Sequence, residues 1–216
     1  GQVSLSGSDV DGDDLTYSIT GGSDITATLD GSDVTFSAPQ DFNGSESFSV
    51  SVTDDEYTDS QNITVTVNAV NDAPVADAVS ETINEDQSMV ISLSGSDIDG
   101  DNLTFSLDSD ATNGSVTLDG SLVTYAPNSN FNGSDSFIFA VSDGEYSSSA
   151  EVSVTITAIN DAPVLAAVSD VSFDEDGSGS TSLSGSDVDG DALTYSITDG
   201  TDITAELTGS DITFNG

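Results

Sequence analysis

The ten residues Ser4–Asp13, SLSGSDVDGD, decide the fold of this chain because they occur three times. They return at 92–101, where Ile98 is the one substitution, and again without change at 182–191. A unit that returns at a nearly constant spacing of about 89 residues is the signature of a tandem-repeat array. The chain is therefore expected to consist of successive copies of one small module.

Two other markers share this spacing. The segment Asn-Asp-Ala-Pro-Val begins at Asn71 and again at Asn160, and Phe-Asn-Gly-Ser begins at Phe42 and Phe131. Proline cannot donate to a β-ladder and holds its predecessor extended, so the Asn-Asp-Ala-Pro segments mark linkers between repeats. The sequence predicts a first repeat without its first strand, one complete repeat, and a third repeat interrupted near its middle, with these bounds: 1–71, 72–160 and 161–216.

The complete repeat has the period-two alternation of apolar and polar residues that is typical of β-strands. Asp119-Gly120 is a hairpin signal. Seven short strands with evenly spaced turns predict an all-β, Ig-like β-sandwich, and the three sandwiches should follow one another linearly. The expected strands are 79–83, 89–93, 103–107, 116–118, 122–125, 137–141 and 152–156, with 193–197 repeating the third of them. By the same alternation Tyr17, Phe105 and Tyr195 should face the core.

The composition excludes most enzyme classes. The chain contains no Lys, Arg, His or Cys and has a net charge of −40. It therefore lacks an imidazole base, a thiol nucleophile, a Schiff-base amine and a cationic oxyanion site, although paired carboxylates remain. We expect no enzymatic activity. Nucleic acid is excluded as a partner because nothing can neutralise a phosphate, and no apolar run is long enough for membrane insertion.

The large negative charge leaves two interpretations open. A high net charge with few aromatic residues is a signature of disorder. However, 35% of the residues are apolar, and they fall in alternating runs. The alternative is that cations neutralise the acids. Asp outnumbers Glu by 32 to 8, and Asp is the acid favoured in turns and as an oxygen ligand of hard cations.

The Asp-x-Asp-Gly-Asp loop at Asp97, Asp99 and Asp101 is the motif most informative about chemistry. Three carboxylates within five residues repel one another without a cation, and together they offer much of the oxygen shell of Ca²⁺. The spacing differs from that of an EF-hand, because Gly stands fourth and a strand follows. A solvated turn is the alternative. The other copies of the motif are Asp9, Asp11 and Asp13, and Asp187, Asp189 and Asp191.

Several of these motifs together resemble a known family. The run Ala140–Gly144 and the linker Ile159–Val164 resemble the close of a cadherin repeat, and Asn84-Glu85-Asp86 resembles its early acidic motif. The Asn-Asp-Ala-Pro-Val openings and the Phe-Asn-Gly-Ser-(Asp/Glu)-Ser-Phe segments are more similar still to the cadherin-like tandem repeats of large bacterial surface adhesins. The resemblance covers the whole chain.

This resemblance implies that Ca²⁺ binds at the joint between repeats and stiffens the array. The acidic motif that animal cadherins carry before their sixth strand is absent, and Asp41 and Asn130 near that place are not assigned as ligands, so the number of ions per joint is left open. The implied ligands of the first joint are Asn71, Asp72, Asp97, Asp99 and Asp143. Those of the second joint are Glu85, Asn160, Asp161, Asp187 and Asp189. Asp54 and Glu175 occupy positions equivalent to these ligands in the other repeats. Asp13, Asp101 and Asp191 would serve a second ion or none.

The expected function is that of a structural spacer or filament segment in a secreted or cell-surface adhesin. Its expected partners are Ca²⁺, the neighbouring repeats and like chains in a fibre. Two alternatives remain: sandwiches that themselves bind carbohydrate or a partner protein, and accessory modules of a secreted enzyme. Asn-x-Ser/Thr triplets begin at Asn43, Asn62, Asn102, Asn113 and Asn132, and they matter only if the source organism glycosylates asparagine.

Overall fold

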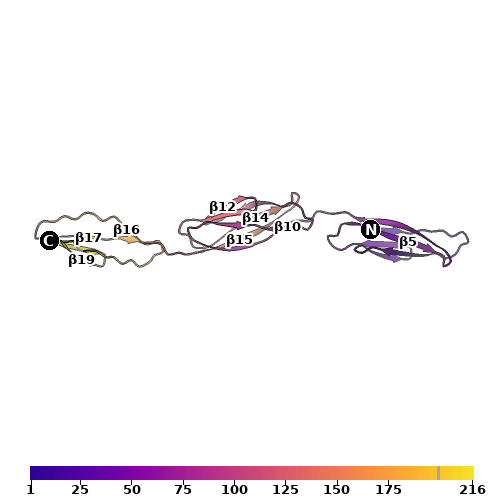
Figure 1. The fold of residues 1–216 in the computed structure, drawn as a ribbon, viewed down its shortest axis with the longest axis horizontal. Coiled ribbons are helices and arrows are strands. Elements are labelled where there is room, and N and C mark those ends of the chain that lie inside the picture. The colour runs from indigo at the N-terminus through magenta and orange to yellow at the C-terminus, as the bar shows by residue number, and fades with distance from the viewer. Residues whose placement is uncertain (199) are drawn as a thin grey trace. The chain divides into compact units, whose positions relative to one another are not determined.

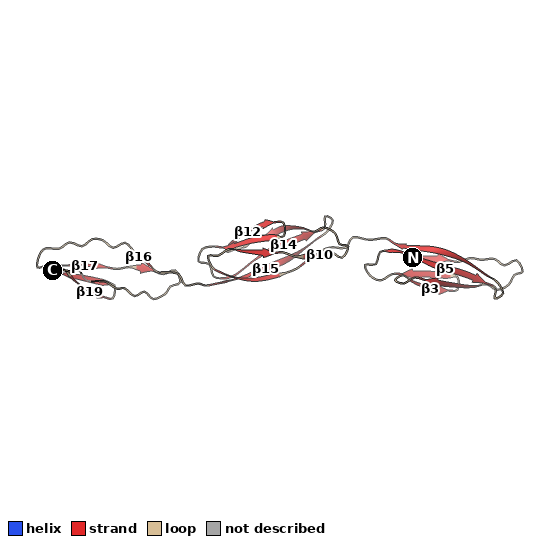
Figure 2. Cartoon of the chain, viewed as in Figure 1, coloured by secondary structure: helices blue, strands red, loops and turns tan. Residues whose placement is uncertain are grey.

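The computed structural model describes residues 1–198 and 200–216, and within them every regular element is a β-strand (Figures 1 and 2). The described residues include no helix long and apolar enough to cross a membrane. The all-β prediction is confirmed. Strands arise where Val, Ile, Thr, Phe and Tyr alternate with polar residues, and Gly, Asp and Asn fill the turns between them.

The first repeat forms two three-stranded sheets, in the orders β1-β4-β3 and β2-β5-β6. Phe36 of one sheet and Phe48 of the other meet edge to face with ring centroids 5.2 Å apart. This contact joins the two sheets, so the repeat is a sandwich with its core between them. The strands are β1 (Gln2–Ser4), β2 (Thr16–Gly21), β3 (Thr26–Asp30), β4 (Asp33–Ser37), β5 (Gly44–Thr53) and β6 (Thr58–Val67).

The second repeat has a three-stranded sheet, β12-β13-β9, a four-stranded sheet, β11-β14-β15-β8, and a small pair, β10-β7. β8 pairs in parallel with β15, so the first long strand of the repeat lies beside its last. The strands are β7 (Val75–Ala76), β8 (Val79–Asn84), β9 (Met89–Ser92), β10 (Gly95–Ser96), β11 (Thr104–Ser109), β12 (Gly114–Asp119), β13 (Leu122–Pro127), β14 (Gly133–Ser142) and β15 (Ser147–Thr157).

The core of the second repeat is the more completely buried of the two. Tyr125 of one sheet stacks on Phe137 of the other at 6.4 Å, and Phe139 and Val152 are fully buried. Burying one such side chain contributes about 1.5–3 kcal/mol. The seven predicted strands of this repeat are confirmed, and Gly120 turns the expected hairpin with φ 60°. The short pair β7 and β10 was not predicted.

The third repeat forms the sheet β17-β20-β19 and the pair β16-β18. The strand predicted around Leu193, Tyr195 and Ile197 is wrong: these residues alternate in burial but form no strand. The equivalent strands β2 and β11 pair with β5 and β14, and the described residues after 160 include no such partner. The strands are β16 (Val164–Leu165), β17 (Ser178–Ser182), β18 (Gly185–Ser186), β19 (Thr204–Thr208) and β20 (Asp211–Asn215).

Contacts divide the chain into two compact units that do not follow the repeats. The linker that begins at Asn71 belongs to the first unit, and the linker that begins at Asn160 belongs to the second. The first unit is Gly1–Val75 with Ser96–Leu103 and Ser142–Ser147. The second unit is Ala76–Gly95, Thr104–Val141 and Ser148–Gly216. Each linker is therefore described together with the acidic loop that follows it in the sequence.

Candidate functional site

The Asp-x-Asp-Gly-Asp loop of the second repeat is folded by its own first carboxylate. Asp97 Oδ1 accepts hydrogen bonds from the backbone N–H groups of Asp99 (2.8 Å), Gly100 (3.1 Å) and Asp101 (3.4 Å). Gly100 has φ 81°, a left-handed conformation that glycine adopts without steric cost. One oxygen of Asp97 thus fixes the loop, which leaves the other oxygen for a different partner.

The other two copies of the loop are folded in the same way. In each copy, Oδ1 of the first Asp accepts hydrogen bonds from backbone N–H groups one turn further on. The donors to Asp9 are Asp11 (2.8 Å), Gly12 (2.8 Å) and Asp13 (3.1 Å), and the donors to Asp187 are Asp189 (3.0 Å) and Asp191 (3.2 Å). The motif therefore has a local structural role wherever it occurs, in addition to any role as a ligand.

The linker before the second repeat is held by this loop and by the turn after β14. The backbone N–H of Asp72 donates to Asp99 Oδ2 at 2.8 Å, and the amide nitrogen of Asn71 donates to Asp143 Oδ2 at 2.9 Å. We call Asn71, Asp72, Asp97, Asp99 and Asp143 the first joint. Two hydrogen bonds therefore join the linker to the acids of the first joint: Asn71 bonds to Asp143, and Asp72 bonds to Asp99.

Asp143 is held in place from both sides. Its Oδ1 accepts the backbone N–H groups of Glu145 and Tyr146, both at 2.7 Å, while Oδ2 accepts the Asn71 amide. Burial alone would raise the pKa of Asp143, but these hydrogen bonds outweigh it and lower the pKa below its ordinary value. Asp143 is therefore a fixed carboxylate that remains ionised.

Several negatively charged side chains lie close together at the first joint and repel one another. Burial raises the pKa of Asp72, and the negative charges of Asp41, Asp99 and Asp97 raise it further. The Oδ2 atom of Asp97 is buried and has no hydrogen-bond partner. A buried carboxylate oxygen without a partner among like charges is unfavourable, and a cation would relieve both conditions.

The second joint repeats this pattern around Asp161. We define it as Glu85, Asn160, Asp161, Asp187 and Asp189. The backbone N–H of Asp161 donates to Asp189 Oδ2 at 2.7 Å, and the side chain of Asn160 donates to the backbone oxygen of Asp161 at 2.9 Å. Glu85 is 4% exposed and accepts the linker N–H of residue 159 at 2.6 Å. The second linker is thus held by residues that come both before and after it in the sequence.

The second joint is also crowded with negative charge. Burial raises the pKa of Asp161, followed in effect by the charges of Asp189, Asp86, Glu85 and Asp187. Its Oδ2 atom is buried without a hydrogen-bond partner. In both joints a linker N–H bonds to the second Asp of the loop, and a linker carboxylate has a raised pKa. Each joint also contains one buried carboxylate oxygen without a hydrogen-bond partner, which belongs to Asp97 in the first joint and to Asp161 in the second.

No three acidic side chains converge as a ready-made metal cluster anywhere in residues 1–198 and 200–216. The carboxylates of each joint lie around the linker, and several of their oxygens accept hydrogen bonds from backbone or amide N–H groups. The donor types nevertheless fit a hard cation, because carboxylate and amide oxygens are the ligands that Ca²⁺ prefers. In residue type and charge the joints fit calcium, and ligation would require the side chains to move closer together.

The remaining predicted ligands lie in their own turns. Asp54, which matches Asp143, accepts the backbone N–H groups of Tyr57 (2.6 Å) and Glu56 (2.9 Å), and these bonds lower its pKa. Side chains exposed to solvent are those of Asp11, Asp13, Asp101, Asp191 and Glu175. The structure does not bring these side chains into contact with a linker.

Two acids omitted from the predicted sites contribute charge at the joints. Asp41 raises the pKa of Asp72, and Asp86 raises that of Asp161. Asp86 also accepts the backbone N–H of Asn130 at 3.0 Å. Both acids have positive φ, 58° for Asp41 and 60° for Asp86. The sequence could have indicated both acids by their positions, because Asp41 directly precedes Phe-Asn-Gly-Ser and Asp86 directly follows Glu85.

A further acid, in the Phe-Asn-Gly-Ser-(Glu/Asp) segment, proves to be structural. In the second repeat it is Asp135, which is 7% exposed. It accepts the Tyr125 hydroxyl at 2.9 Å and the backbone N–H groups of Thr112 (3.1 Å) and Asn113 (2.9 Å). Burial, and then the hydrogen bond to Asp135, raise the pKa of Tyr125, so its hydroxyl remains a donor.

The first repeat places Glu46 at the equivalent position. Its carboxylate accepts the backbone N–H groups of Ser23 (3.0 Å), Asp24 (3.0 Å) and Ile25 (2.9 Å) and the Ser23 hydroxyl (2.6 Å). The hydrogen bond from the Ser23 side chain, followed by those from the backbone, lowers the pKa of Glu46 to about 2. This acid therefore fixes the loop between β2 and β3 in the first repeat and the loop between β11 and β12 in the second.

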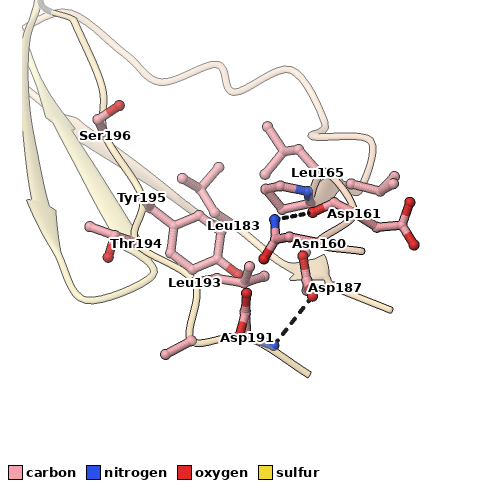
Figure 3. Close-up of a pocket in the computed structure, with 14 residues that line it drawn as sticks. Asn160, Asp161, Leu165, Leu183, Asp187, Asp191, Leu193, Thr194, Tyr195 and Ser196 are labelled. Carbon is pink, nitrogen blue, oxygen red and sulfur yellow. Dashed lines mark hydrogen bonds between the residues drawn. The ribbon is translucent and has the colours of Figure 1, made fainter. Parts of the chain in front are cut away.

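A cavity of about 490 Å³ lies beside the second joint, between the linker and the 183–196 segment (Figure 3). Asn160, Asp161, Asp187 and Asp191 form its polar side. Its apolar side includes Tyr195, whose counterpart Phe105 in the second repeat stacks on Phe139 of β14 at 6.4 Å. The counterpart of this apolar wall thus packs against the neighbouring strand of its own sheet in the second repeat, and the cavity gives no reason to assign a small-molecule ligand.

Comparison with known proteins now decides the family. A model described as a bacterial Ig domain matches residues 1–66 and 71–157. The chain belongs to the bacterial Ig domain family. Bacterial Ig domains and cadherin-like domains are generally extracellular or at the cell surface, and they are typically not catalytic. The predicted resemblance to cadherin-like bacterial surface repeats is confirmed.

One solved structure supports the fold of this bacterial Ig domain chain, and another is similar at a lower score. Mouse protocadherin-24 EC1-3 matches with a TM-score of 0.54 and 17% identity over 94% of this chain and 77% of that chain. Drosophila N-cadherin EC1-4 matches with a TM-score of 0.49 and 15% identity, over 99% of this chain and 60% of that chain. Among curated proteins no sequence matches.

An endo-fucoidan hydrolase of glycoside hydrolase family 107 also matches, with a TM-score of 0.35 and 21% identity over 94% of this chain. The bacterial Ig domain chain spans 34% of the length of that hydrolase. This match carries no argument about carbohydrate binding or catalysis, because the identity and the structural similarity are both low.

Proposed function

We propose that this chain is a non-catalytic spacer segment of an extracellular adhesin or surface fibre, and that Ca²⁺ at its joints stiffens successive repeats. The partners are calcium ions, the neighbouring repeats and like chains in the fibre. A catalytic role is disfavoured because the sequence contains no His, Cys, Lys or Arg. Repeats that share the same motifs favour a spacer as well, since a specific binding site rarely needs copying along an array.

One observation carries the proposal: both linkers make the same contact with the loop that follows them. Asp72 N–H bonds to Asp99, and Asp161 N–H bonds to Asp189, at 2.8 and 2.7 Å. In both joints this contact comes with a linker carboxylate whose pKa is raised by burial and by neighbouring acids. An arrangement that keeps like charges together twice requires a compensating charge, which this chain does not supply.

A bound divalent cation would supply that charge. Asn71, Asp72, Asp97, Asp99 and Asp143 would hold it at the first joint, and Glu85, Asn160, Asp161, Asp187 and Asp189 at the second. Calcium replaces repulsion between the carboxylates with shared ligation by oxygen atoms. Without calcium, acids closer than the screening length of about 8 Å repel one another and the linker flexes.

The test is small-angle scattering and thermal unfolding of the full chain with calcium and with EDTA. We expect EDTA to lower the melting temperature and shorten the maximum dimension, because a flexible array is shorter on average than a stiff one. Calorimetric titration should show binding with Kd of about 0.1–1 mM, the range of extracellular modules. Asp97→Asn combined with Asp99→Asn should remove the response of the first joint.

The matched control is Asp9→Asn combined with Asp11→Asn. It makes the same change in charge and in loop chemistry, but it leaves the hydrogen bond from the Asp72 N–H to Asp99 in place. The control variant should keep most of the calcium response. Equal scattering and melting with calcium and with EDTA would mean that the acidic loops are merely solvated, and the calcium proposal would then be abandoned.

A further inference from the structure

The sheet β12-β13-β9 of the second repeat exposes two aliphatic side chains on its outer face. Leu122 of β13 is 48% exposed and Val90 of β9 is 62% exposed. Thr124 pairs with Val90 and stands two residues after Leu122, so the two aliphatic residues are diagonal neighbours across adjacent strands. Diagonal neighbours lie about 7–8 Å apart. One partner can therefore cover both side chains at once, as a single apolar patch.

The other two repeats have polar residues at these two positions. Their sheets, β1-β4-β3 and β17-β20-β19, keep the same order of equivalent strands. The exposed residues at the two positions are Gln2 and Asp33 in the first repeat and Ser180 and Asp211 in the third. The fold of a repeat therefore does not depend on aliphatic residues there, and within the described part of the chain the patch belongs to the second repeat alone.

The face that carries the patch also has little charge. The chain has 40 acidic residues and no Lys or Arg, yet Asp119 is the one acid within β9, β12 and β13, which the structure describes throughout. The corresponding sheet of the first repeat carries Asp30 and Asp33, and that of the third carries Glu206 and Asp211. The second repeat thus replaces part of the repulsion on this face with apolar surface.

A second copy of this chain is the partner that such a face suits. A cationic protein would be attracted to the acidic surfaces elsewhere and would gain nothing from the loss of an acid here. A like chain is repelled by those surfaces, because its own net charge is −40. It can approach closely where acids are few, and burying aliphatic side chains there is favourable. A two-fold contact uses the same face of both copies, so one patch supplies both halves of the interface.

We propose that the outer face of β12-β13-β9 binds the same face of a second copy of this chain, around a two-fold axis at Thr124. The strands of the two copies run in opposite directions, and the aliphatic pairs of both copies pack together between the sheets. Sheets packed face to face lie about 10 Å apart, which is close enough to exclude water from Leu122 and Val90. Asp119 stands opposite Leu122, so the two copies of Asp119 are about 13 Å apart along the strands, beyond the screening length of about 8 Å.

The contact specifies how like chains meet in the proposed fibre, and to that extent it rests on the proposed function. It contains no residue of either joint and requires no metal ion. Its test is therefore made in EDTA, where the calcium proposal plays no part. A negative result would remove the lateral contact and leave the calcium response of the joints untouched.

The test is sedimentation equilibrium of the full chain in EDTA, at protein concentrations up to the millimolar range. High salt is included because it screens the repulsion between the chains. We expect a reversible dimer. Val90→Gln combined with Leu122→Asn should lower the association constant by about tenfold or more, because a symmetric dimer loses each buried side chain twice. Neither substitution changes the charge, and both positions are polar in the other repeats.

The matched control is Ile138→Asn. Ile138 is 41% exposed and lies in β14, in the other sheet of the same repeat. The substitution is an equally neutral loss of an exposed aliphatic side chain, and it should leave the association constant unchanged. The reverse exchange, Gln2→Val with Asp33→Leu, copies the patch into the first repeat. It should add a second contact per chain and produce species larger than a dimer.

A disulfide trap locates the contact, because the chain contains no cysteine. Thr124→Cys places a thiol at the expected axis, and Thr35→Cys places one at the equivalent exposed position of the first repeat. Under mild oxidation, Thr124→Cys should form disulfide-linked dimers at least about tenfold faster than Thr35→Cys, because the contact raises the effective concentration of the first thiol alone.

The proposal fails in any of three cases. A chain that stays monomeric at every concentration would show that the patch serves a different partner or none. Equal weakening by Ile138→Asn and by Val90→Gln with Leu122→Asn would show that the association does not use this face. Equal trapping at Thr35→Cys and Thr124→Cys would show that the chains do not meet around Thr124.

Discussion

The first and second repeats fix the same loop with different acids, and the comparison shows how two positions compensate each other. The first repeat combines Phe36 with Glu46, and the second combines Tyr125 with Asp135. Glu46 accepts backbone N–H groups and the Ser23 hydroxyl. Asp135 is one methylene shorter and takes a hydrogen bond from the Tyr125 hydroxyl instead. Glu46, the longer acid, therefore occurs together with Phe36, whose ring has no hydroxyl group.

This difference teaches that the acid and the aromatic residue form one unit. A buried tyrosine needs a partner for its hydroxyl, and a buried carboxylate needs several donors. Asp135 and Tyr125 are hydrogen-bonded to each other inside the core, whereas all donors to Glu46 come from the loop. Exchanging one member of a pair should therefore cost more than exchanging both, and the following predictions test that statement.

The largest effect is expected for Asp135→Ala. The substitution leaves the Tyr125 hydroxyl and the N–H groups of Thr112 and Asn113 without their acceptor in a buried site. The loss of this acceptor should lower the free energy of unfolding by about 2–4 kcal/mol. Chemical denaturation followed by peptide-resolved hydrogen exchange should assign the loss to the second repeat. A loss below about 0.5 kcal/mol would show that the loop does not depend on this carboxylate.

A smaller effect is expected for Tyr125→Phe, which copies the aromatic residue of the first repeat. It removes one hydrogen bond to a carboxylate and should cost about 1.5–3 kcal/mol. Combining it with Asp135→Glu recreates the pair of the first repeat and should recover part of that loss. A double-mutant cycle measures the coupling. Additive effects would contradict the pairing of the two positions.

The smallest effect is the pH dependence of the loop in the first repeat. The pKa of Glu46 is lowered from 4.5 to about 2 by its hydrogen bonds, so the ionised form stabilises the fold. This contribution is complete above pH 4.5 and disappears as the pH falls toward 2. The protection factors of residues 22–25, which correct for the pH dependence of intrinsic exchange, should fall over that range, and Glu46→Gln should flatten the profile. An identical profile in the variant would exclude Glu46 as the cause.

The strands could be predicted from the sequence because their cause is local. Alternation of apolar and polar residues indicates one buried face, and the burial of β15 alternates along its whole length. The strand expected around Tyr195 shows the limit of this reasoning, since a strand also requires a partner to pair with. Its alternating burial persists without a ladder.

The candidate site was less accessible to sequence reasoning. The motif marks the acidic loop, but only the structure shows that Asp72 and Asp161 contact Asp99 and Asp189 through their backbone N–H groups. The role of Asp135 was not predicted, because its donors come from the loop before β12 and from β13, which are distant from it in the sequence. Metal ligation by the joint residues stays a prediction.

The parallel pairing of β8 with β15 has a consequence for synthesis of the protein. Ile83 and Thr157, which meet at the end of this pairing, are 74 residues apart. At about 5–20 residues per second, the ribosome needs roughly 4–15 s to deliver the partner of β8. During that interval β8 is an unpaired strand, so the sandwich of the second repeat cannot close until β15 has been synthesised.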